Sequence, residues 1–412
     1  MVWWTEERIP VFGQHDDEAL NQIRDVNSRA LRTALMADGH PGYIMPIGGV
    51  AAYDNKVSVA GVGYDIACGN IAIRTDDTVE VLDEFLSDIA DDIQFQISFG
   101  VGRTNDNTDA PTDHTLFEAD QWNIIPLSHR GTMRELARDQ LGTVGSGNHY
   151  VDVFVDGADQ HIWVGCHFGS RGFGHKIATA FMALAAGKQW GERVKEAETL
   201  LDLNTQLGQD YWDLMQLAGQ YAYAGRAWVA RHVVENIIGA HIHSVVHNNH
   251  NFAWRETHEL TPGDERNLVV VRKGATPAWP GQYGFIGGSM GDNAVIVRGA
   301  EQNANTDLQK SALFSTVHGA GRVMSRRKAK GKVHRKTGRV LEEGEISRDM
   351  MDSWLQGEQV LLRGGDLDEA PQAYRRLPDV LQNHEGTIEI LHTLRPLIVV
   401  MAGEGEYDPY RD

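Results

Sequence analysis

Residues 161–174 read HIWVGCHFGSRGFG, an apolar run that passes directly into a glycine-rich turn. A short apolar run that ends in glycines is typical of a strand. The side chains of His167 and Arg171 follow the run, at the place where a rigid scaffold presents loops to a ligand. This stretch therefore predicts a sheet whose strand ends carry the functional groups.

Other runs along the chain predict the remaining elements. Short apolar or alternating runs predict strands at residues 56–60, 71–74, 150–155, 268–271 and 294–298. Apolar residues at spacings of three and four predict helices at residues 17–36, 79–94, 177–200 and 209–238. Because strands and helices do not alternate regularly, we expect an α+β fold rather than a doubly wound sheet. No repeat or Pro/Ser-rich linker divides the chain, so residues 1–412 are expected to form a single domain.

The composition limits the class of protein. The formal net charge of -19 argues against a general nucleic-acid coat, which needs clustered Lys and Arg. The first twenty residues lack a basic start followed by an apolar core, and no apolar run approaches the ~18 residues of a membrane span. With only two cysteines, a disulfide framework is not expected. We therefore expect a cytoplasmic protein with no membrane partner.

One segment departs from the acidic balance. Residues 322–339 read RVMSRRKAKGKVHRKTGR and hold nine Lys or Arg with no Asp or Glu. A local basic stripe in an acidic chain indicates one phosphate-bearing partner docked at one place. A solvated surface loop is the alternative interpretation on charge alone.

Potential metal ligands occur in separate glycine-flanked segments. Asp65 and Cys68 stand three apart in GVGYDIACGN, so a carboxylate and a thiolate can face one point. His149, His167 and His250 could complete one or two sites with them, although each His alone could be a hydrogen-bonded structural residue. Dispersed ligands of this kind suit a catalytic site with open positions. Ligand softness alone favours Zn, and the carboxylate also admits Mn or Fe.

The stretch STVHGAGRVMSRRKAK, residues 315–330, contains a candidate nucleophile. His318, Arg322 and Arg326 are spaced by four, so a helix beginning here would place them on one face. An imidazole beside two guanidinium groups could attack a phosphorus atom and form a phosphoramidate, whereas the alternative is a packing or capping histidine. Glycine-rich pieces at residues 272–281 and 285–293 allow close approach of a nucleotide. Together these features suit phosphoryl or nucleotidyl transfer.

Seven motifs taken in order resemble one known family. They are GVGYDIACGN, GSGNHYVD, HFGSRGFG, HNFAWRE, RKGATPA, GSMG and STVHGAGRVMSR. They resemble the RtcB-type RNA-splicing ligases, and MADGHPGYIMPIGGV resembles the family's earlier Pro-Asp-Val-His segment. The likeness extends from about Trp4 to Leu397. The chain resembles a divergent paralogue within this family. This resemblance implies one complex α+β domain, with mixed or antiparallel sheets flanked by helices around a deep metal site.

The resemblance also implies an activity. In that family, RNA with a 2',3'-cyclic phosphate or 3'-phosphate end is joined to a 5'-hydroxyl end with Mn2+ and GTP, for RNA repair or tRNA splicing. His318 matches the histidine that takes GMP covalently, and an accessory activating protein is a possible partner. The residues that match the ligands of two Mn2+ ions are Asp65, Cys68, His149, His167 and His250, with Cys68 able to bridge. Mn2+ is therefore preferred over Zn on the resemblance, not on ligand softness.

Further positions match the family's nucleotide and phosphate contacts. Those expected to contact the nucleotide are Asn148, His149, Tyr150, Val151, Asp152, His250, Asn251, Gly287, Gly288, Ser289, Met290, His318, Gly319, Ala320 and Gly321. Those expected to bind phosphate or RNA are Arg171, Arg322 and Arg326.

Several positions depart from the family pattern. Asp152 stands for the usual Glu, Ala294 for Ser and Met401 for the near-terminal Lys. Each change removes a polar partner from a nucleotide edge, and a lost hydrogen bond shifts affinity by ~1–3 kcal/mol. Further departures are Phe168 for Ser, Gly287 for Pro, Gly225 for Asn, and an acidic tail that could crowd the pocket. Two other functions therefore stay open: a metal-dependent phosphoesterase acting on RNA ends, and a nucleotide- or RNA-binding protein without ligation.

Overall fold

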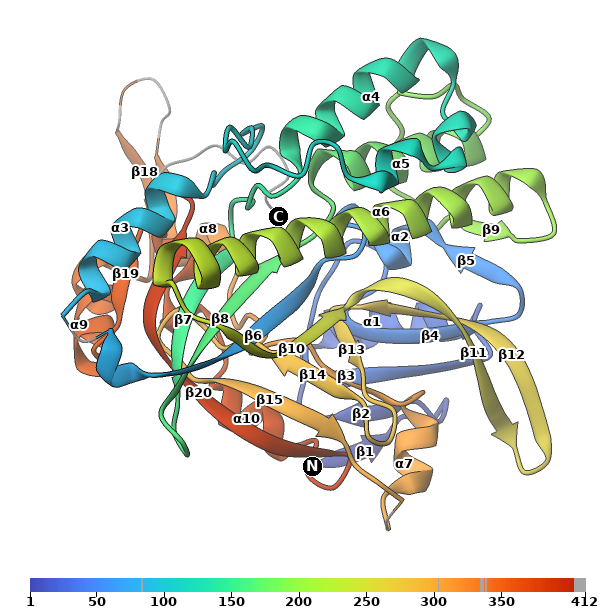
Figure 1. Ribbon diagram of the computed structural model, residues 1–412. Helices are drawn as coiled ribbons and strands as arrows, with labels where there is room; N and C mark the ends of the chain where they lie inside the picture. The colour runs from blue at the N-terminus through green and yellow to red at the C-terminus, as the bar shows by residue number, and fades with distance from the viewer. Residues whose placement is uncertain (83, 303, 334–336, 338, 404–412) are drawn as a thin grey trace.

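The computed structural model describes residues 1–82, 84–302, 304–333, 337 and 339–403. Its centre consists of two sheets (Figure 1). The first has six strands in the order β1 (Val2–Trp4), β2 (Pro10–Phe12), β3 (Arg32–His40), β4 (Ile47–Tyr53), β12 (Asp264–Lys273) and β11 (Asn251–Thr261). Neighbouring strands are antiparallel except for β2 and β3, and β11 with β12 forms the long hairpin at one edge.

The second sheet has eight strands. Seven follow the order β10 (Ile242–Asn249), β6 (Gly69–Thr78), β8 (His161–Phe168), β7 (Tyr150–Asp156), β20 (Ile388–Met401), β15 (Ala294–Gly299) and β14 (Tyr283–Ile286), and β19 (Leu361–Arg363) pairs in parallel with β20. Side chains bridge its two ends, because Asn70 Nδ2 donates to Phe285 O and Phe285 N donates to Asn248 Oδ1, both at 2.9 Å. The sheet therefore curls toward a barrel.

Three two-stranded sheets complete the described strands. They are β5 (Lys56–Ser58) with β9 (Leu200–Asp202), β13 (Ala275–Pro277) with β16 (Ser315–Val317), and β17 (Gly331–Val333) with β18 (Val340–Glu343). The pair β13 and β16 is antiparallel and leads the chain directly into the segment that begins at His318.

Helices cover the sheets. The α-helices are α1 (Asp17–Asn27), α2 (Val59–Val62), α3 (Leu86–Gln96), α4 (Leu127–Gln140), α5 (Arg171–Ala185), α6 (Gln206–His232), α7 (Thr306–Ser311), α8 (Arg326–Lys330), α9 (Arg348–Glu358) and α10 (Leu377–Gln382). Shorter 3-10 turns are η1 (Val79–Val81), η2 (Thr115–Glu118), η3 (Asp120–Ile124), η5 (Leu367–Glu369) and η6 (Pro371–Ala373). The π-helical turn η4 (Val233–Ile238) continues α6.

The long helix α6 joins the helical layer to the curled sheet. The Thr205 side chain caps its start by accepting from Gly208 N. The helix packs against α5 on one side and against β6 and β8 on the other, and Figure 1 shows it crossing the sheet beneath α4 and α5. Its buried aromatic residues Tyr211 and Tyr221 lie in the same apolar core as Phe173 of α5. In the part of the chain that the structure describes, no helix combines the length and apolar composition that a membrane crossing requires.

The expected α+β class is confirmed, and two helix predictions are partly wrong. Helix α1 ends at Asn27, and residues 32–36 belong to β3 instead. β3 lies between two other strands and is buried on both faces, so its side chains lack the alternation that marks a half-buried strand. Helix α5 ends at Ala185, before Gly187 with its φ of 73°, and residues 186–199 form no helix.

The remaining element predictions fall close to the observed elements. Strands expected at 150–155, 161–166, 268–271 and 294–298 lie within β7, β8, β12 and β15. The run at 56–60 leaves the strand after Ser58, whose side chain caps α2 by accepting from Gly61 N. The expectation that His318 and Arg322 lie on one helix is wrong, because α8 begins only at Arg326.

A buried ion pair fixes the strand that leads to His318. Arg272 is fully buried, and its Nη1 and Nη2 lie 2.7 and 3.0 Å from the two carboxylate oxygens of Glu256. The same guanidinium donates to Ser315 Oγ and Leu313 O, each at 2.8 Å, which ties β12 to the start of β16. Burial alone would raise the pKa of Glu256, but Arg272 and His258 outweigh it and lower the pKa to about 2.

We expect the substitution Glu256→Gln to destabilise the fold in a pH-dependent way. The folded pKa of about 2 lies below the unfolded value of 4.5, so the stabilisation is complete above pH 4.5 and is lost as the pH falls toward 2. The shift corresponds to about 3 kcal/mol of unfolding free energy at pH 7. Urea denaturation of both proteins should show this difference at pH 7 and a smaller one at pH 4.

The exposed pair of Arg298 and Glu389 supplies the control. Because exposed ion pairs contribute about 0–1 kcal/mol, Glu389→Gln should change the unfolding free energy by less than about 1 kcal/mol. Equal effects of the two substitutions at pH 7 would contradict the role assigned to Glu256.

Candidate functional site

A cavity of about 1500 Å³ opens where strand ends from both sheets meet. Almost all the residues singled out from the sequence line it. They are Asp65, Cys68, Asn148, His149, Tyr150, Asp152, His167, Arg171, His250, Asn251, Gly287, Gly288, Ser289, Met290, His318, Gly319, Ala320, Gly321, Arg322 and Arg326. The structure thus brings together residues separated by up to about 260 positions.

Val151 is the expected nucleotide contact that does not line the cavity. Successive side chains of a strand point to opposite faces, and β7 directs Tyr150 and Asp152 into the cavity. Val151 lies between them, is fully buried, and packs in the apolar core of the curled sheet. Its side chain therefore points away from the cavity, and the expected contact with the nucleotide stays a prediction.

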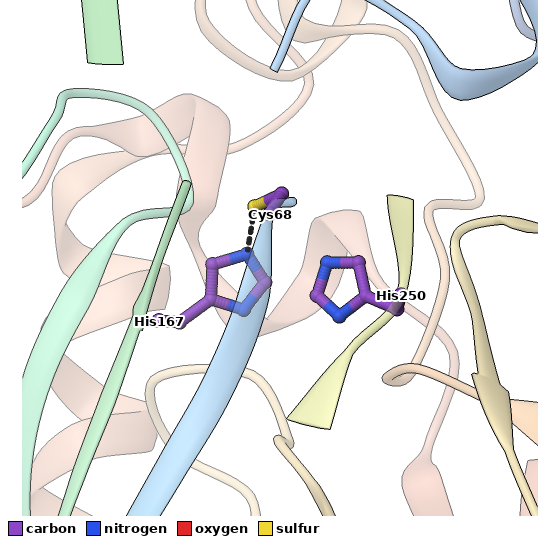
Figure 2. Close-up of side chains that lie close together, drawn as sticks. All are labelled: Cys68, His167 and His250. Atoms are coloured by element: carbon purple, nitrogen blue, oxygen red, sulfur yellow. Dashed lines mark hydrogen bonds between the residues drawn. The ribbon is translucent and has the colours of Figure 1, made fainter. Parts of the chain in front are cut away.

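Five side chains form two groups that could each hold a metal ion. One consists of Asp65, Cys68 and His149, and the other of Cys68, His167 and His250, with the ligand atoms in each group within 4.8 Å of one another. Cys68 Sγ lies 3.3 Å from His167 Nε2 and 3.6 Å from His149 Nε2. Figure 2 shows the His167 and His250 rings next to each other, with the Cys68 thiol joined to the His167 ring by a hydrogen bond. The shared thiol places the two groups side by side.

Three strand ends produce this geometry. Cys68 immediately precedes β6, His167 pairs with Asn70 of β6 from the neighbouring β8, and His250 lies in the turn between β10 and β11. The backbone N–H of His250 donates to Cys68 O at 2.8 Å. A Cβ atom at Gly69 would lie 2.2 Å from Asn248 O, so the strands can approach this closely only with glycine there.

The protonation of the group suits a metal ion. Burial lowers the pKa of His167 and His250 well below the usual value, with further lowering from neighbouring imidazoles. Burial raises the pKa of Asp65, but hydrogen bonding and charge from His149 outweigh it and lower the pKa overall. Neutral imidazoles and an ionised carboxylate are the forms that bind cations. Burial and Asp65 raise the pKa of the Cys68 thiol, and a bound cation would favour its thiolate instead.

The fully buried guanidinium of Arg226 connects the three segments. Its Nη1 donates to Ala67 O at 2.8 Å and to Phe168 O at 2.6 Å, and its Nη2 donates to Asn249 Oδ1 at 2.5 Å. Each acceptor belongs to a residue adjacent to one of the candidate ligands Cys68, His167 and His250. Such supporting hydrogen bonds orient metal ligands. Sequence reasoning missed Arg226, although a lone Arg within the apolar run YAYAGRAWVA is a signal of a buried charge.

His318 lies beside the second candidate metal group. Its ring centroid is 4.8 Å from that of His250, and its Nδ1 is 2.6 Å from Oδ2 of Asp38. Asp38 is fully buried and also accepts from the backbone N–H groups of His318 and Gly319. Burial would raise the pKa of Asp38, but His318 and these hydrogen bonds lower it overall. A carboxylate this close to Nδ1 favours the tautomer with the proton on Nδ1, which would leave Nε2 unprotonated as the candidate nucleophilic nitrogen.

Asp38 is a second residue that the sequence analysis did not single out. It lies on β3 of the six-stranded sheet, 280 positions before His318. The segment MADGHPGYIMPIGGV pointed to this region, but nothing in the residue pattern linked its carboxylate to His318.

The basic side chains of Arg322 and Arg326 are bound to carboxylates. Arg322 Nη1 lies 3.3 Å from Glu369 Oε2, and Arg326 Nη1 lies 3.3 Å from Asp368 Oδ2. Both acidic residues are nearly fully buried, and Lys330 pairs with Asp366 at 2.8 Å in the same way. Arg322, Arg326 and Lys330 are therefore neutralised inside the fold, and a phosphate would compete with these carboxylates. Residues 334–336 and 338 of the stripe lie outside the described residues.

Arg375 is a cavity-lining cation that the sequence analysis missed. It donates to the backbone carbonyl groups of Asp38, Gly39 and Arg322 at 3.1–3.3 Å. Within the described chain, no carboxylate lies within ion-pair distance of it. Its charge is therefore available to an anion in the cavity.

The departures from the family pattern have different structural settings. Asp152 and Met401 line the cavity, as expected, but Ala294 is fully buried among apolar side chains inside the curled sheet and does not. Burial raises the pKa of Asp152 well above its usual value. The carboxyl group can therefore donate as well as accept a hydrogen bond. The acidic tail at residues 404–412 lies outside the described residues.

Other departures compensate for one another. A Cβ atom at Gly225 would lie 3.3 Å from the Phe168 ring, so the small residue on α6 provides room for the large one on β8. A Cβ atom at Gly287 would lie 2.3 Å from the Tyr150 hydroxyl, so a larger residue there would require the Tyr150 ring to shift. The pair of Phe168 and Gly225 explains how the fold tolerates two side chains that differ from the family pattern.

We expect Cys68→Ala to weaken metal binding at both groups because the thiol is shared. Titration with Co2+ should show a thiolate-to-metal absorption band in the unaltered protein and none in the variant. Cys166→Ala is the matched control, because Cys166 is also buried and free but packs in an apolar core. Loss of the band in Cys166→Ala, with Cys68→Ala unaffected, would contradict the assignment.

We expect Arg226→Met to lower Co2+ affinity by about 10- to 100-fold, as loss of a residue that orients ligands typically does. Arg226→Lys keeps the charge but not the forked geometry, so it should recover only part of the affinity. Calorimetric titration measures the affinity, and thermal melting identifies variants that fail to fold. A folded Arg226→Met protein with unchanged affinity would exclude the orienting role, and the exposed Arg255→Met serves as control.

Comparison with known proteins gives one consistent family. The family described as tRNA-splicing ligase RtcB matches residues 20–402. The RNA-splicing ligase RtcB of Escherichia coli strain K12 is 31% identical over 391 residues, covering 89% of this chain and 89% of the relative. The tRNA-splicing ligase RtcB of Archaeoglobus fulgidus is 30% identical, covering 88% and 86%. RNA-splicing ligase RtcB homolog 2 of Entamoeba dispar is 30% identical, covering 90% and 80%.

Proposed function

Because the chain belongs to the RtcB family of tRNA-splicing ligases, we propose that it joins RNA 2',3'-cyclic phosphate or 3'-phosphate ends to 5'-hydroxyl ends with GTP. Family membership indicates an RNA ligase. We propose in addition the RNA ends that it joins, GTP as its nucleotide and a covalent histidine intermediate. The observation that supports it best is the contact of His318 with buried Asp38, beside the candidate metal ligand His250.

The proposed reaction proceeds through His318. Its Nε2 attacks the α-phosphorus of GTP, so that an N–P bond forms and pyrophosphate leaves. An oxygen of the RNA 3'-phosphate then attacks the same phosphorus, and the N–P bond breaks to return the imidazole. The 5'-hydroxyl attacks the RNA phosphorus, GMP leaves, and the hydroxyl proton passes to solvent. A cyclic phosphate end is first opened by water to the 3'-phosphate.

The residues of this chain have separate roles in that scheme. Asp38 orients the imidazole and stabilises its positive charge in the adduct. Arg375 is available to bind phosphate oxygens, and Arg171, which also lines the cavity, is proposed to do the same. Two Mn2+ ions, held by Asp65, Cys68 and His149 and by Cys68, His167 and His250, would polarise phosphate oxygens when bound.

The choice of base depends on the altered wall of the cavity. Asp152 and Met401 face a nucleotide in place of the family's Glu and Lys. A protonated Asp152 can both donate to and accept from a base edge. GTP is proposed as the substrate because of family membership. The other nucleoside triphosphates are alternative substrates that the experiment below also tests.

Broader features of the proposal follow from the same observations. We propose that residues 1–412 act as one catalytic domain, because both sheets supply residues to the cavity. A cytoplasmic location remains a prediction, supported by two free cysteines. An accessory activating protein also remains a prediction.

We expect a nucleotide-sized mass increase when the protein is incubated with Mn2+ and GTP, and none in His318→Ala. Intact-protein mass spectrometry with each nucleoside triphosphate in turn identifies the base. Asp38→Asn should slow adduct formation by about 100-fold or more, because it no longer fixes the imidazole tautomer. RNA with 3'-phosphate and 5'-hydroxyl ends then tests joining.

The alternatives give different results in the same assays. Protein that holds metal and opens a cyclic phosphate, but forms no adduct with any nucleotide, would be a phosphoesterase. Protein that binds nucleotide or RNA without an adduct or cleavage would be a binding protein. Either outcome would reject the ligase proposal.

A further inference from the structure

The cavity continues beyond the metal groups along two helices. On α5, Arg171, His175 and Thr179 are spaced by four and line it with one face. On α4, His129 and Leu136 contribute a similar face, seven residues apart. We call this extension, between α4, α5 and residues 186–199, the outer arm. Figure 1 shows α4 and α5 together above α6.

Partly exposed aromatic rings line the outer arm. The Tyr64 and His175 rings stack at a centroid distance of 5.0 Å, and the exposed ring of Tyr43 meets the edge of Tyr64 at 6.0 Å. Farther along, Trp190 stacks with His129 at 6.5 Å. All five side chains line the cavity and are exposed or only half-buried, so a ligand can reach them.

The charge of the arm favours an anionic ligand. Between α5 and residues 186–199, Lys176 and Arg193 line it together with Glu196, and Asp16 and Glu18 of the segment at the start of α1 line the same cavity. The chain as a whole carries a net charge of -19, so a cavity wall with an excess of cations is an exception in this protein. Basic groups interleaved with aromatic rings are the pattern by which proteins bind single-stranded nucleic acid.

The arm is continuous with the proposed catalytic centre. A Cβ atom at Gly145 would touch both Arg171 Nη1 and His149 Nδ1, which places the start of α5 beside a candidate metal ligand. An α-helix rises 1.5 Å per residue, so Thr179 lies about 12 Å farther along the helix than Arg171. A strand whose end lies at His318 would therefore extend past the rings.

We propose that the outer arm binds unpaired RNA nucleotides next to the end that is joined, by stacking bases on His175 and Trp190. This inference rests on the proposed function, since it takes RNA as the ligand. Bases in a duplex have both faces covered by neighbouring base pairs, so a stacking surface selects unpaired nucleotides. The site would be tolerant of sequence, because every base has a π face.

The test compares RNA affinity in variants of the arm. The probe is a fluorescein-labelled eight-nucleotide RNA with a 3'-phosphate, used as a single strand and in a blunt duplex. Trp190→Leu and His175→Gln remove aromatic surface while avoiding Tyr64, which is adjacent to the candidate ligand Asp65. Tyr283→Leu is the control, because Tyr283 is 51% exposed on β14 and does not line the cavity. Thermal melting confirms folding of each variant.

We expect each arm variant to weaken single-strand binding about fivefold or more, with Tyr283→Leu unchanged and the duplex bound weakly by all. The inference is overturned if both folded arm variants bind within twofold of the unaltered protein, if the duplex binds as tightly as the single strand, or if the unaltered protein binds no RNA. The last outcome would leave the arm for another occupant, such as a protein segment.

Adduct formation by the unaltered protein separates this inference from the proposed function. An adduct with GTP together with unchanged RNA affinity in the arm variants rejects the arm alone. No adduct, with RNA affinity still reduced in those variants, rejects the ligase proposal and supports the arm as an RNA site.

Discussion

The hydrogen bonds of the buried Arg226 guanidinium are the constraint on which the cavity depends. Burial of a charged group without an adjacent carboxylate is costly, and burial indeed lowers the pKa of Arg226. Two backbone carbonyl groups, the Asn249 amide and the His247 ring satisfy its donors. Because these acceptors belong to three different segments, one side chain determines how the ligand-bearing strand ends meet. The ionised carboxylate of Asp65 lies close enough to favour the cation.

Pairing with buried carboxylates, and not the density of basic residues in the sequence, decides which cations of this protein stay available to a ligand. The stripe beginning at Arg322 is the most basic part of the chain, yet its Arg322, Arg326 and Lys330 are neutralised by η5 and the residue before it. Arg375, which lies in an ordinary stretch of sequence, is a cavity cation with no carboxylate within ion-pair distance among the described residues. The ion pairs formed in the folded protein, and not the basic stretch of the sequence, therefore indicate where an anion could bind.

Two of the differences from the family pattern form a structural pair. Phe168 and Gly225 come from different elements but occupy one space. Asp152 and Met401 have no such compensation, because both face the cavity. The first kind of change preserves packing, whereas the second alters what the cavity can bind. The second kind of change therefore bears most directly on the proposed choice of base.

The sequence by itself determined the α+β class and most strands, and it singled out the candidate ligands and the candidate nucleophile, because glycine-flanked histidines after apolar runs mark strand ends. It did not determine the length of α1 and α5 or the strand β3, since a strand buried on both faces has no alternating pattern. Only the tertiary structure decided that Val151 and Ala294 face the core, and that Asp38 and Arg226 support the site. Their partners lie far away along the chain, so the physical contacts that give them a role exist only after the two sheets and α6 have packed together.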